Sequence, residues 1–371
     1  MKGLNNPIGY KSNQILQNPF IMNPFRFSSG GVSEGGWKEL GRVSGSASVN
    51  MTVDIGTSPP EYLMYLSDTR PATGNGDTNI RLGNTATPID TANNYASRLT
   101  SNGSGDATNG NIGYVRVDPN MWNNATPRFS TGYISNKLSE EKLMTTHTVD
   151  LFGSGAGTAP DRAEVVGKWA NTTTQINYVT MVNLQGNNWS SDSEFVVLGY
   201  DTTYANPTSE NFWEELSSVD MSVAGNTLSS GTFTSKKYLW VQGYTFGTSG
   251  NEVCMRVGNT SIDSGSNYAY RYSSNGGADS TEVNKTQFAD LTNVTPIFWN
   301  YFIINDASYE KIVIGHATRQ NTSGESNAPT RFEEVGKWVN TSSQIDIIDF
   351  ENTGASGEMS IGTKIRVWGS N

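Results

Sequence analysis

Short runs in which apolar and polar residues alternate recur along the chain from residue 61 onward. Alternation with a period of two places successive side chains on opposite faces of a β-strand. Clusters of Gly, Asn and Ser, such as 74–77 and 273–277, separate the runs and favour turns. The pattern predicts strands at 61–67, 113–117, 142–146, 165–170, 176–182 and 194–199, and at 238–243, 252–257, 298–304, 311–316, 345–350 and 364–369. The best helix candidate is the short segment 209–219.

The second pattern is an internal repeat. Residues 141–176 match residues 310–345 without a gap, at an offset of 310 − 141 = 169. Upstream the copies align with gaps, beginning at Trp37 and Trp213, and the length differences fall in Gly/Asn/Ser-rich loops. Each copy is far longer than a solenoid unit, so the repeat predicts two tandem domains, at 32–205 and 206–371. The matched pairs Trp169/Trp338, His147/His316 and Arg162/Arg331 should occupy equivalent places.

Many short strands and few helices indicate an all-β protein. The length of each copy and its long loops favour a jelly-roll-like antiparallel β-sandwich over a bare immunoglobulin fold. We therefore expect two duplicated jelly-roll-like sandwiches preceded by an extended N-terminal arm.

The arm, residues 1–31, differs from the rest of the chain. Pro7, Pro19 and Pro24 prevent a continuous helix, and Ser28-Ser29-Gly30-Gly31 indicates a hinge. Burial of each large apolar side chain contributes about 1.5–3 kcal/mol, so we expect the arm to dock on another chain. The assembly residues of the arm are Ile15, Leu16, Phe20, Ile21, Met22, Phe25 and Phe27.

Composition narrows the possible partners. The formal net charge is −10 and the pI about 4.8, which argues against binding nucleic acid through its phosphates. The single cysteine, Cys254, cannot form an internal disulfide and lies in an alternating run, so we expect a buried thiol. The N-terminus has no apolar core of a signal peptide, and no apolar run is long enough to span a membrane.

Catalytic chemistry is sparse. His147 and His316 are the two histidines, and because they lie in different repeats we expect no shared zinc site. Nucleophile-elbow, metalloprotease and phosphate-loop motifs are missing from the sequence, so we expect no enzyme, catalytic residue, metal or cofactor. Paired carboxylates that could cleave sugars are Glu164 with Glu333, or Glu140 with Glu141, although Glu164 is expected to form a strand-face ion pair with Arg162. The oxygen-rich runs 74–78 and 102–109 do not match the EF-hand spacing for calcium.

The tryptophans divide into two groups. Trp169 and Trp338 recur in the repeated Gly-Lys-Trp motif and are expected to anchor the two cores. Trp189, in the loop-like segment 185–193, is the better candidate for a surface contact, such as stacking on a sugar.

Segments 164–169, 194–201 and 362–369 resemble a loosely defined group of jelly-roll-like virion structural proteins from phages and environmental viruses. The resemblance covers residues 37–371 and includes the opening Trp37 and Trp213. The resemblance implies a jelly-roll-like fold and a place in a virion that is assembled in the host cytoplasm. It implies no active-site residues.

Three functions remain open. The first is a non-enzymatic capsid or tail component for decoration or adhesion, which forms a homo-oligomer or joins other virion structural proteins through its arm. The second is a double jelly-roll major capsid protein. The third is a carbohydrate-binding module or glycan hydrolase, for which a host-surface glycan would be the partner.

Overall fold

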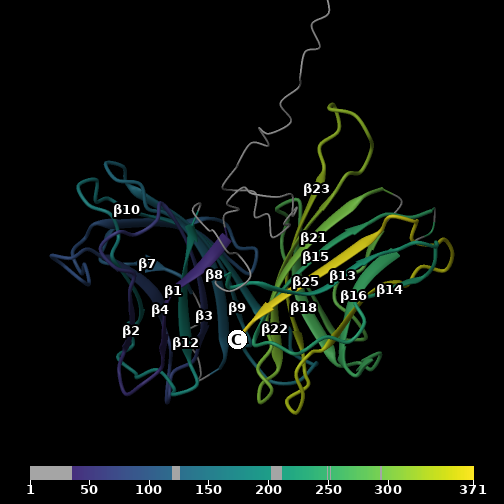
Figure 1. Ribbon diagram of the computed structural model, residues 1–371, viewed down its shortest axis with the longest axis horizontal. Helices are drawn as coiled ribbons and strands as arrows, with labels where there is room; N and C mark the ends of the chain where they lie inside the picture. The colour runs from purple at the N-terminus through teal and green to yellow at the C-terminus, as the bar shows by residue number, and fades with distance from the viewer. Residues whose placement is uncertain (1–35, 119–125, 202–210, 249, 251, 293–294) are drawn as a thin grey trace, which may run out of the picture.

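The computed structural model describes residues 36–118, 126–201, 211–248, 250, 252–292 and 295–371. All of its regular elements in these ranges are β-strands, and no helix that could cross a membrane occurs among them. The predicted all-β fold with two duplicated sandwiches is confirmed. Figure 1 shows the two halves as lobes side by side, the first purple to teal and the second green to yellow.

The first domain consists of two antiparallel sheets. Its large sheet has eight strands, in spatial order β1 (Gly36–Ser44), β12 (Glu194–Asp201), β3 (Tyr62–Thr69), β8 (Arg128–Ser135), β9 (Lys142–Asp150), β10 (Asp161–Trp169), β5 (Tyr95–Ser101) and β6 (Ala107–Ile112). Its small sheet has the order β2 (Asn50–Asp54), β11 (Tyr178–Asn183), β4 (Thr78–Gly83) and β7 (Val115–Arg116).

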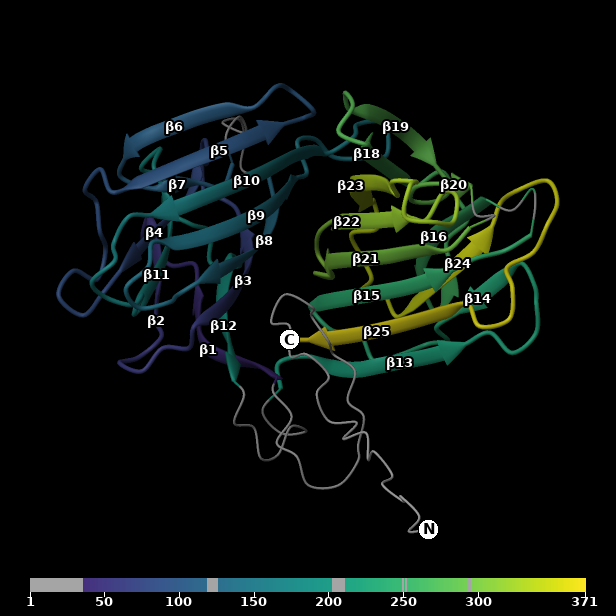
Figure 2. The same ribbon diagram turned by 90° about the horizontal axis from the view of Figure 1, so that it is seen from above.

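The second domain repeats the order of the large sheet strand for strand and adds one short strand to its small sheet. Its large sheet has the order β13 (Glu214–Asp220), β25 (Lys364–Ser370), β15 (Tyr238–Thr245), β21 (Ile297–Ile304), β22 (Lys311–Arg319), β23 (Thr330–Trp338), β18 (Tyr268–Ser274) and β19 (Ser280–Lys285). Its small sheet contains β14 (Thr227–Ser229), β24 (Ile347–Asn352), β16 (Glu252–Asn259) and β17 (Ser261–Ile262), with β20 (Leu291–Thr292) also paired to β16. Figure 2 shows the large sheet of this domain from above.

Each domain has its core between its two sheets, because alternate residues of most strands point inward. Trp169 and Trp338 lie in these cores, as predicted, and both are buried. Their indole nitrogens donate equivalent hydrogen bonds of 2.8 Å to the carboxylates of Asp90 and Asp263. The buried thiol of Cys254 is also confirmed.

One core position shows how the copies diverged. In the first domain Tyr65 lies over Gly132, and its hydroxyl donates to Thr146 on β9. In the second domain the position of Gly132 is taken by Tyr301, which lies over Gly315, the equivalent of Thr146. In the second domain the aromatic ring is therefore carried by the next strand of the sheet, and the glycine that leaves room for it is also one strand further along.

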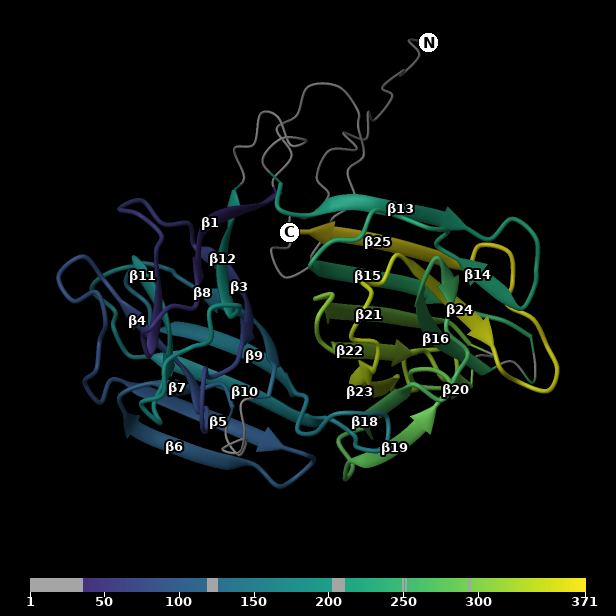
Figure 3. The same ribbon diagram turned by 90° about the horizontal axis from the view of Figure 1, so that it is seen from below.

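The predicted helix at 209–219 is wrong. The described part of this segment enters β13, which pairs antiparallel with β25 along Glu214–Asp220. An isolated helix of this length is marginal in water, whereas pairing with β25 satisfies the backbone at once. The predicted boundary at 205/206 falls within 202–210, outside the described residues, as does the arm at 1–31. Viewed from below, the C-terminus lies between the two lobes (Figure 3), where the carbonyl of Asn371 accepts a hydrogen bond of 2.5 Å from Arg42 on β1.

Candidate functional site

The outer faces of the two large sheets meet in an apolar interface between the domains. The first domain contributes residues of β1, β3, β8, β9 and β12, and the second contributes residues of β15, β21, β22, β23 and β25 and of the segment just before β13. The buried members are Trp37, Met64, Leu66, Phe129, Val149, Leu151, Val196, Leu198, Phe212, Trp213, Tyr238, Trp240, Phe302, Ile304, Ile312, Ile314, Val335 and Trp368. Because burial of such side chains stabilises association, the two sandwiches pack as one body.

Polar contacts surround this apolar interface. The hydroxyl of Tyr238 donates to Glu194 at 2.7 Å, and the Lys237 ammonium lies 3.2 Å from the same carboxylate. Arg70 stacks over the ring of Tyr309 at 3.6 Å, and that hydroxyl donates to Asp192 at 2.8 Å.

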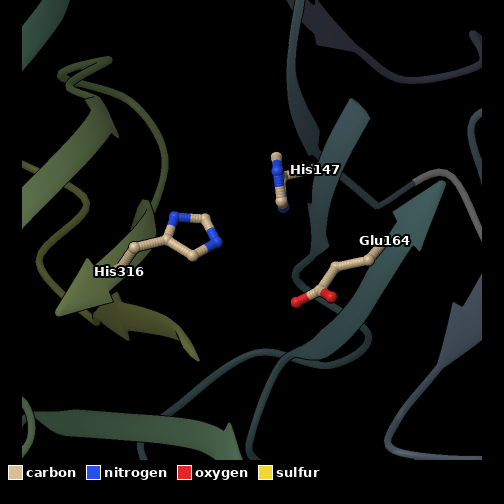
Figure 4. Close-up of side chains that lie close together, drawn as sticks. All are labelled: His147, Glu164 and His316. Carbon is tan, nitrogen blue, oxygen red and sulfur yellow. The ribbon is translucent and has the colours of Figure 1, made fainter. Parts of the chain in front are cut away.

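At the interface His147 of β9 faces its repeat equivalent His316 of β22. The ring centroids are 4.5 Å apart and the rings meet edge to face at 74°. The carboxylate of Glu164 on β10 points toward both (Figure 4), and one ligand atom from each of the three residues lies within 4.8 Å of the other two. The separation of the two histidines in the sequence, from which no shared zinc site was expected, does not keep their side chains apart. They do belong to different domains, but the domains meet at their outer sheet faces, where each strand carries its histidine.

Arg162 compensates the carboxylates around this cluster. Its guanidinium contacts Glu164, donates to Asp279 at 2.6 Å and donates to Glu333 at 2.9 Å. The predicted Arg162–Glu164 ion pair is confirmed. Arg331, the repeat equivalent of Arg162, has the same backbone setting, since the N–H groups of Arg162 and Arg331 donate to Asn102 and Asn275 respectively. Its side chain is 60% exposed, so the expected equivalence holds for the backbone and fails for the guanidinium.

Burial dominates the electrostatics of the cluster. It lowers the pKa of His147 to about 4, and it lowers the pKa of His316 well below the usual value for histidine, so both imidazoles are neutral at pH 7. Burial raises the pKa of Glu164 to about 7, although Arg162 acts in the opposite direction, and the nearby Glu333 raises it further. One guanidinium therefore binds three carboxylates.

Two imidazoles and one carboxylate are a ligand set that suits zinc. A tetrahedral ion with bonds of about 2.0–2.2 Å needs ligand atoms about 3.4 Å apart, so these side chains would have to close by up to about 4.8 − 3.4 = 1.4 Å. The cavity between these side chains has a volume of about 10 Å³, which leaves room for about one water molecule. The carboxylate of Glu164 is already bound by the guanidinium of Arg162. The arrangement fits a neutral histidine pair beside an ion-pair network better than a metal centre.

The first domain has a second notable surface, a groove of about 930 Å³ on the outer face of its large sheet. Side chains from β1, β3, β5, β6, β8, β9 and β10 line it. Leu143 and Val166 on its floor are half exposed, Trp37 and Tyr62 lie at one end, and Lys168 adds a charge. None of the described residues that line the groove is Asp or Glu.

The remaining candidates are distributed elsewhere. Trp189, expected at the surface, is buried in the first core, where it bridges to Pro71. It occupies the place of Met359 in the second domain, and a match between such unlike residues is not visible as sequence identity. Glu141 pairs with Lys168 at 2.8 Å on the surface. The arm residues Ile15, Leu16, Phe20, Ile21, Met22, Phe25 and Phe27 lie outside the described residues.

Comparisons with known proteins gave a similarity among solved structures and no match among families or curated proteins. No protein-family model matches the chain, and no curated protein matches it. Among solved structures, it is similar to domains LG4-5 of the mouse laminin alpha1 chain, at 11% identity over 92% of each chain with a TM-score of 0.19. At this TM-score, no statement about function follows from the similarity.

Proposed function

We propose that this chain is a non-enzymatic structural protein of a virus particle, a component for decoration or adhesion that joins its neighbours through exposed apolar surface. The observation that carries the proposal is the open groove on the first domain. A contiguous apolar face of this kind favours a protein contact over solvent. The resemblance of segments 164–169, 194–201 and 362–369 to virion proteins supplies the setting.

The N-terminal arm is the first candidate for the joining device. It carries Lys2, Lys11 and Arg26 and no acidic residue within residues 1–31, whereas the whole chain has a net charge of −10. The rest of the chain therefore has a net charge of −10 − 3 = −13, and a basic apolar arm is attracted to the acidic body of another copy.

Deletion of residues 1–30 tests the arm. We expect the shortened chain to keep its β-sheet circular dichroism and its unfolding transition but to sediment as a smaller species than the full chain. Equal sedimentation of the two forms would exclude the arm as an assembly device. Counting copies per particle by electron microscopy separates decoration from a double jelly-roll major capsid shell.

A carbohydrate-binding role is the second candidate, because aromatic rings at the end of the groove could stack on sugars. Trp37, Tyr62 and Tyr133 line that end of the groove, and the amide of Asn109 and the hydroxyl of Thr108 line it from β6 at the opposite edge of the sheet. Cleavage of a glycan in this groove would lack its chemistry, since none of the described lining residues supplies the pair of carboxylates that glycosidases use. A glycan array probed with the native chain and with Tyr62→Ala tests the binding role, and absence of any saturable signal would exclude it.

A further inference from the structure

The two domains use different halves of the same sheet face to bind each other. We call surface A the half that the first domain uses, Leu66, Phe129, Val149 and Val196. We call surface B the half that the second domain uses, Tyr238, Phe302, Ile312, Ile314 and Val335. Surface A of the first domain packs on surface B of the second, so the contact is head to tail. The positions that both domains use are the row with His147 and His316 and the matched pairs Trp37/Trp213, Met64/Trp240 and Leu198/Trp368.

A head-to-tail contact between two similar domains leaves one copy of each surface uncovered. Surface B of the first domain is the floor and wall of the groove. There Leu143 is 57% exposed, whereas its equivalent Ile312 is buried by the other domain. Surface A of the second domain is open in the same way, since Phe298 is 45% exposed and its equivalent Phe129 is buried.

The polar contacts of the interface also have equivalents at the two open surfaces. Arg162 of the first domain binds Asp279 of the second. Their equivalents are Arg331 of the second domain and Asp106 of the first, whose side chains are 60% and 55% exposed. A contact between copies that reproduced the interdomain interface would bring these two charges together.

A loop contact is repeated in the same manner. Within the chain the N–H of Gly155 donates to Glu310 at 2.6 Å, and Glu310 pairs with Lys337 at 3.4 Å. The first domain has the equivalent ion pair, Glu141 with Lys168, and it is exposed to solvent. The equivalent donor is Gly324, which lies in an exposed loop and has a positive φ of 102°, as Gly155 has at 80°.

One ion pair is conserved with its signs reversed. Glu194 on the side of surface A pairs with Lys237 on the side of surface B at 3.2 Å. The equivalents at the open surfaces are Lys364, which pairs with Asp220 at 2.9 Å, and Glu61, so both charges have changed sign and are still opposite. A double reversal of this kind preserves complementarity between two surfaces that do not touch within one chain.

We propose that the chains associate head to tail, with surface A of the second domain of one copy on surface B of the first domain of the next. The interdomain interface is then repeated between chains, and it closes into a ring or continues as a filament according to its rotation. Gln242, Thr318 and Arg366 stand where surface A of the first domain has Leu66, Val149 and Val196, so the contact between chains is weaker than the contact within them. This inference deepens the proposed function by naming the partner as a second copy, and it depends on residues outside the arm.

Charge reversal in the full-length chain tests the proposal. Arg331→Glu and Asp106→Arg each place like charges together at the contact between chains, while both positions are too exposed to affect folding strongly. Each single variant should weaken concentration-dependent association by at least about tenfold in sedimentation velocity. An equimolar mixture of the two variants should restore it, because each contact in an alternating assembly then joins opposite charges.

Glu252→Arg is the matched control, an exposed reversal on β16 of the small sheet, away from both surfaces, and it should associate like the native chain. Native-like association of both single variants, or no restoration on mixing, would overturn the proposal. If deletion of the arm abolishes association while these reversals leave it unchanged, the arm stands as the joining device and the head-to-tail contact is excluded.

Discussion

Arg162 and Arg331 offer an internal test of what the domain interface contributes to stability. They occupy equivalent positions on β10 and β23, but only Arg162 is enclosed by the other domain. Replacing Arg162 by Ala leaves the carboxylates of Glu164, Asp279 and Glu333 without their shared cation. Asp279 is the most deeply buried of them, with 1% of its side chain exposed.

Loss of one partner from a buried ion pair costs about 3–5 kcal/mol, because the remaining charge stays desolvated. We expect a loss of this size for Arg162→Ala, reduced by protonation of Glu164, whose pKa is already about 7. Arg331 pairs with Glu333 at 3.1 Å on the surface, and Arg331→Ala should cost less than about 1 kcal/mol.

Urea unfolding followed by tryptophan fluorescence provides the measurement, because Trp213, Trp240 and Trp368 lie at the interface and report its loss. The experiment is run at concentrations at which the chain is monomeric. Separation of one transition into two in Arg162→Ala would locate the lost energy in the contact between the domains. Equal losses for the two alanine variants would refute the assignment of a buried role to Arg162 alone.

Two further predictions follow from single positions. In the unfolded chain the imidazoles of His147 and His316 bind protons below about pH 6.5. In the folded chain burial lowers the pKa of both, to about 4 for His147, so they stay neutral over this range. The free energy of unfolding should therefore fall as the pH drops from about 6.5 to about 4. Glu164, whose pKa is raised to about 7, makes the free energy of unfolding change with pH in the opposite direction. The measurement is therefore a comparison of the native chain with the His147→Gln/His316→Gln variant in urea titrations from pH 4 to 7. Identical pH dependence of the two proteins would contradict the prediction. Gly132→Ala would place a Cβ against the ring of Tyr65 and should destabilise the chain by about 1–3 kcal/mol, with unchanged thermal unfolding as the contrary result.

Most of the strands could be predicted from the sequence because alternation with a period of two is a local property. The segments 142–146 and 311–316 lie in β9 and β22, which extend further to Asp150 and Arg319. The missed strands, such as β6 (Ala107–Ile112) and β19 (Ser280–Lys285), lie at the edges of the large sheets. Their exposed polar residues carry no alternating apolar signal, and only pairing with β5 and β18 makes them strands.

The repeat also determined the tandem plan and the two tryptophan anchors, since each Gly-Lys-Trp motif meets an aspartate of its own domain. Trp189 shows the limit of this reasoning, because its equivalent is Met359 and its burial depends on a bridge to a distant loop. The exchange of Tyr65 and Gly132 for Tyr301 and Gly315 is likewise visible only once the strands are in register.

The relation between the two domains was decided by the tertiary structure alone. Alternation marks an outer face on each large sheet, but it does not say which half of that face another domain will cover. That choice depends on the summed packing of Leu66, Phe129 and Val149 against Ile312 and Val335, residues far apart in the sequence. It brings His147 to His316 and buries Arg162 while leaving Arg331 exposed, because a rigid-body contact between two folded surfaces is not encoded in any local pattern.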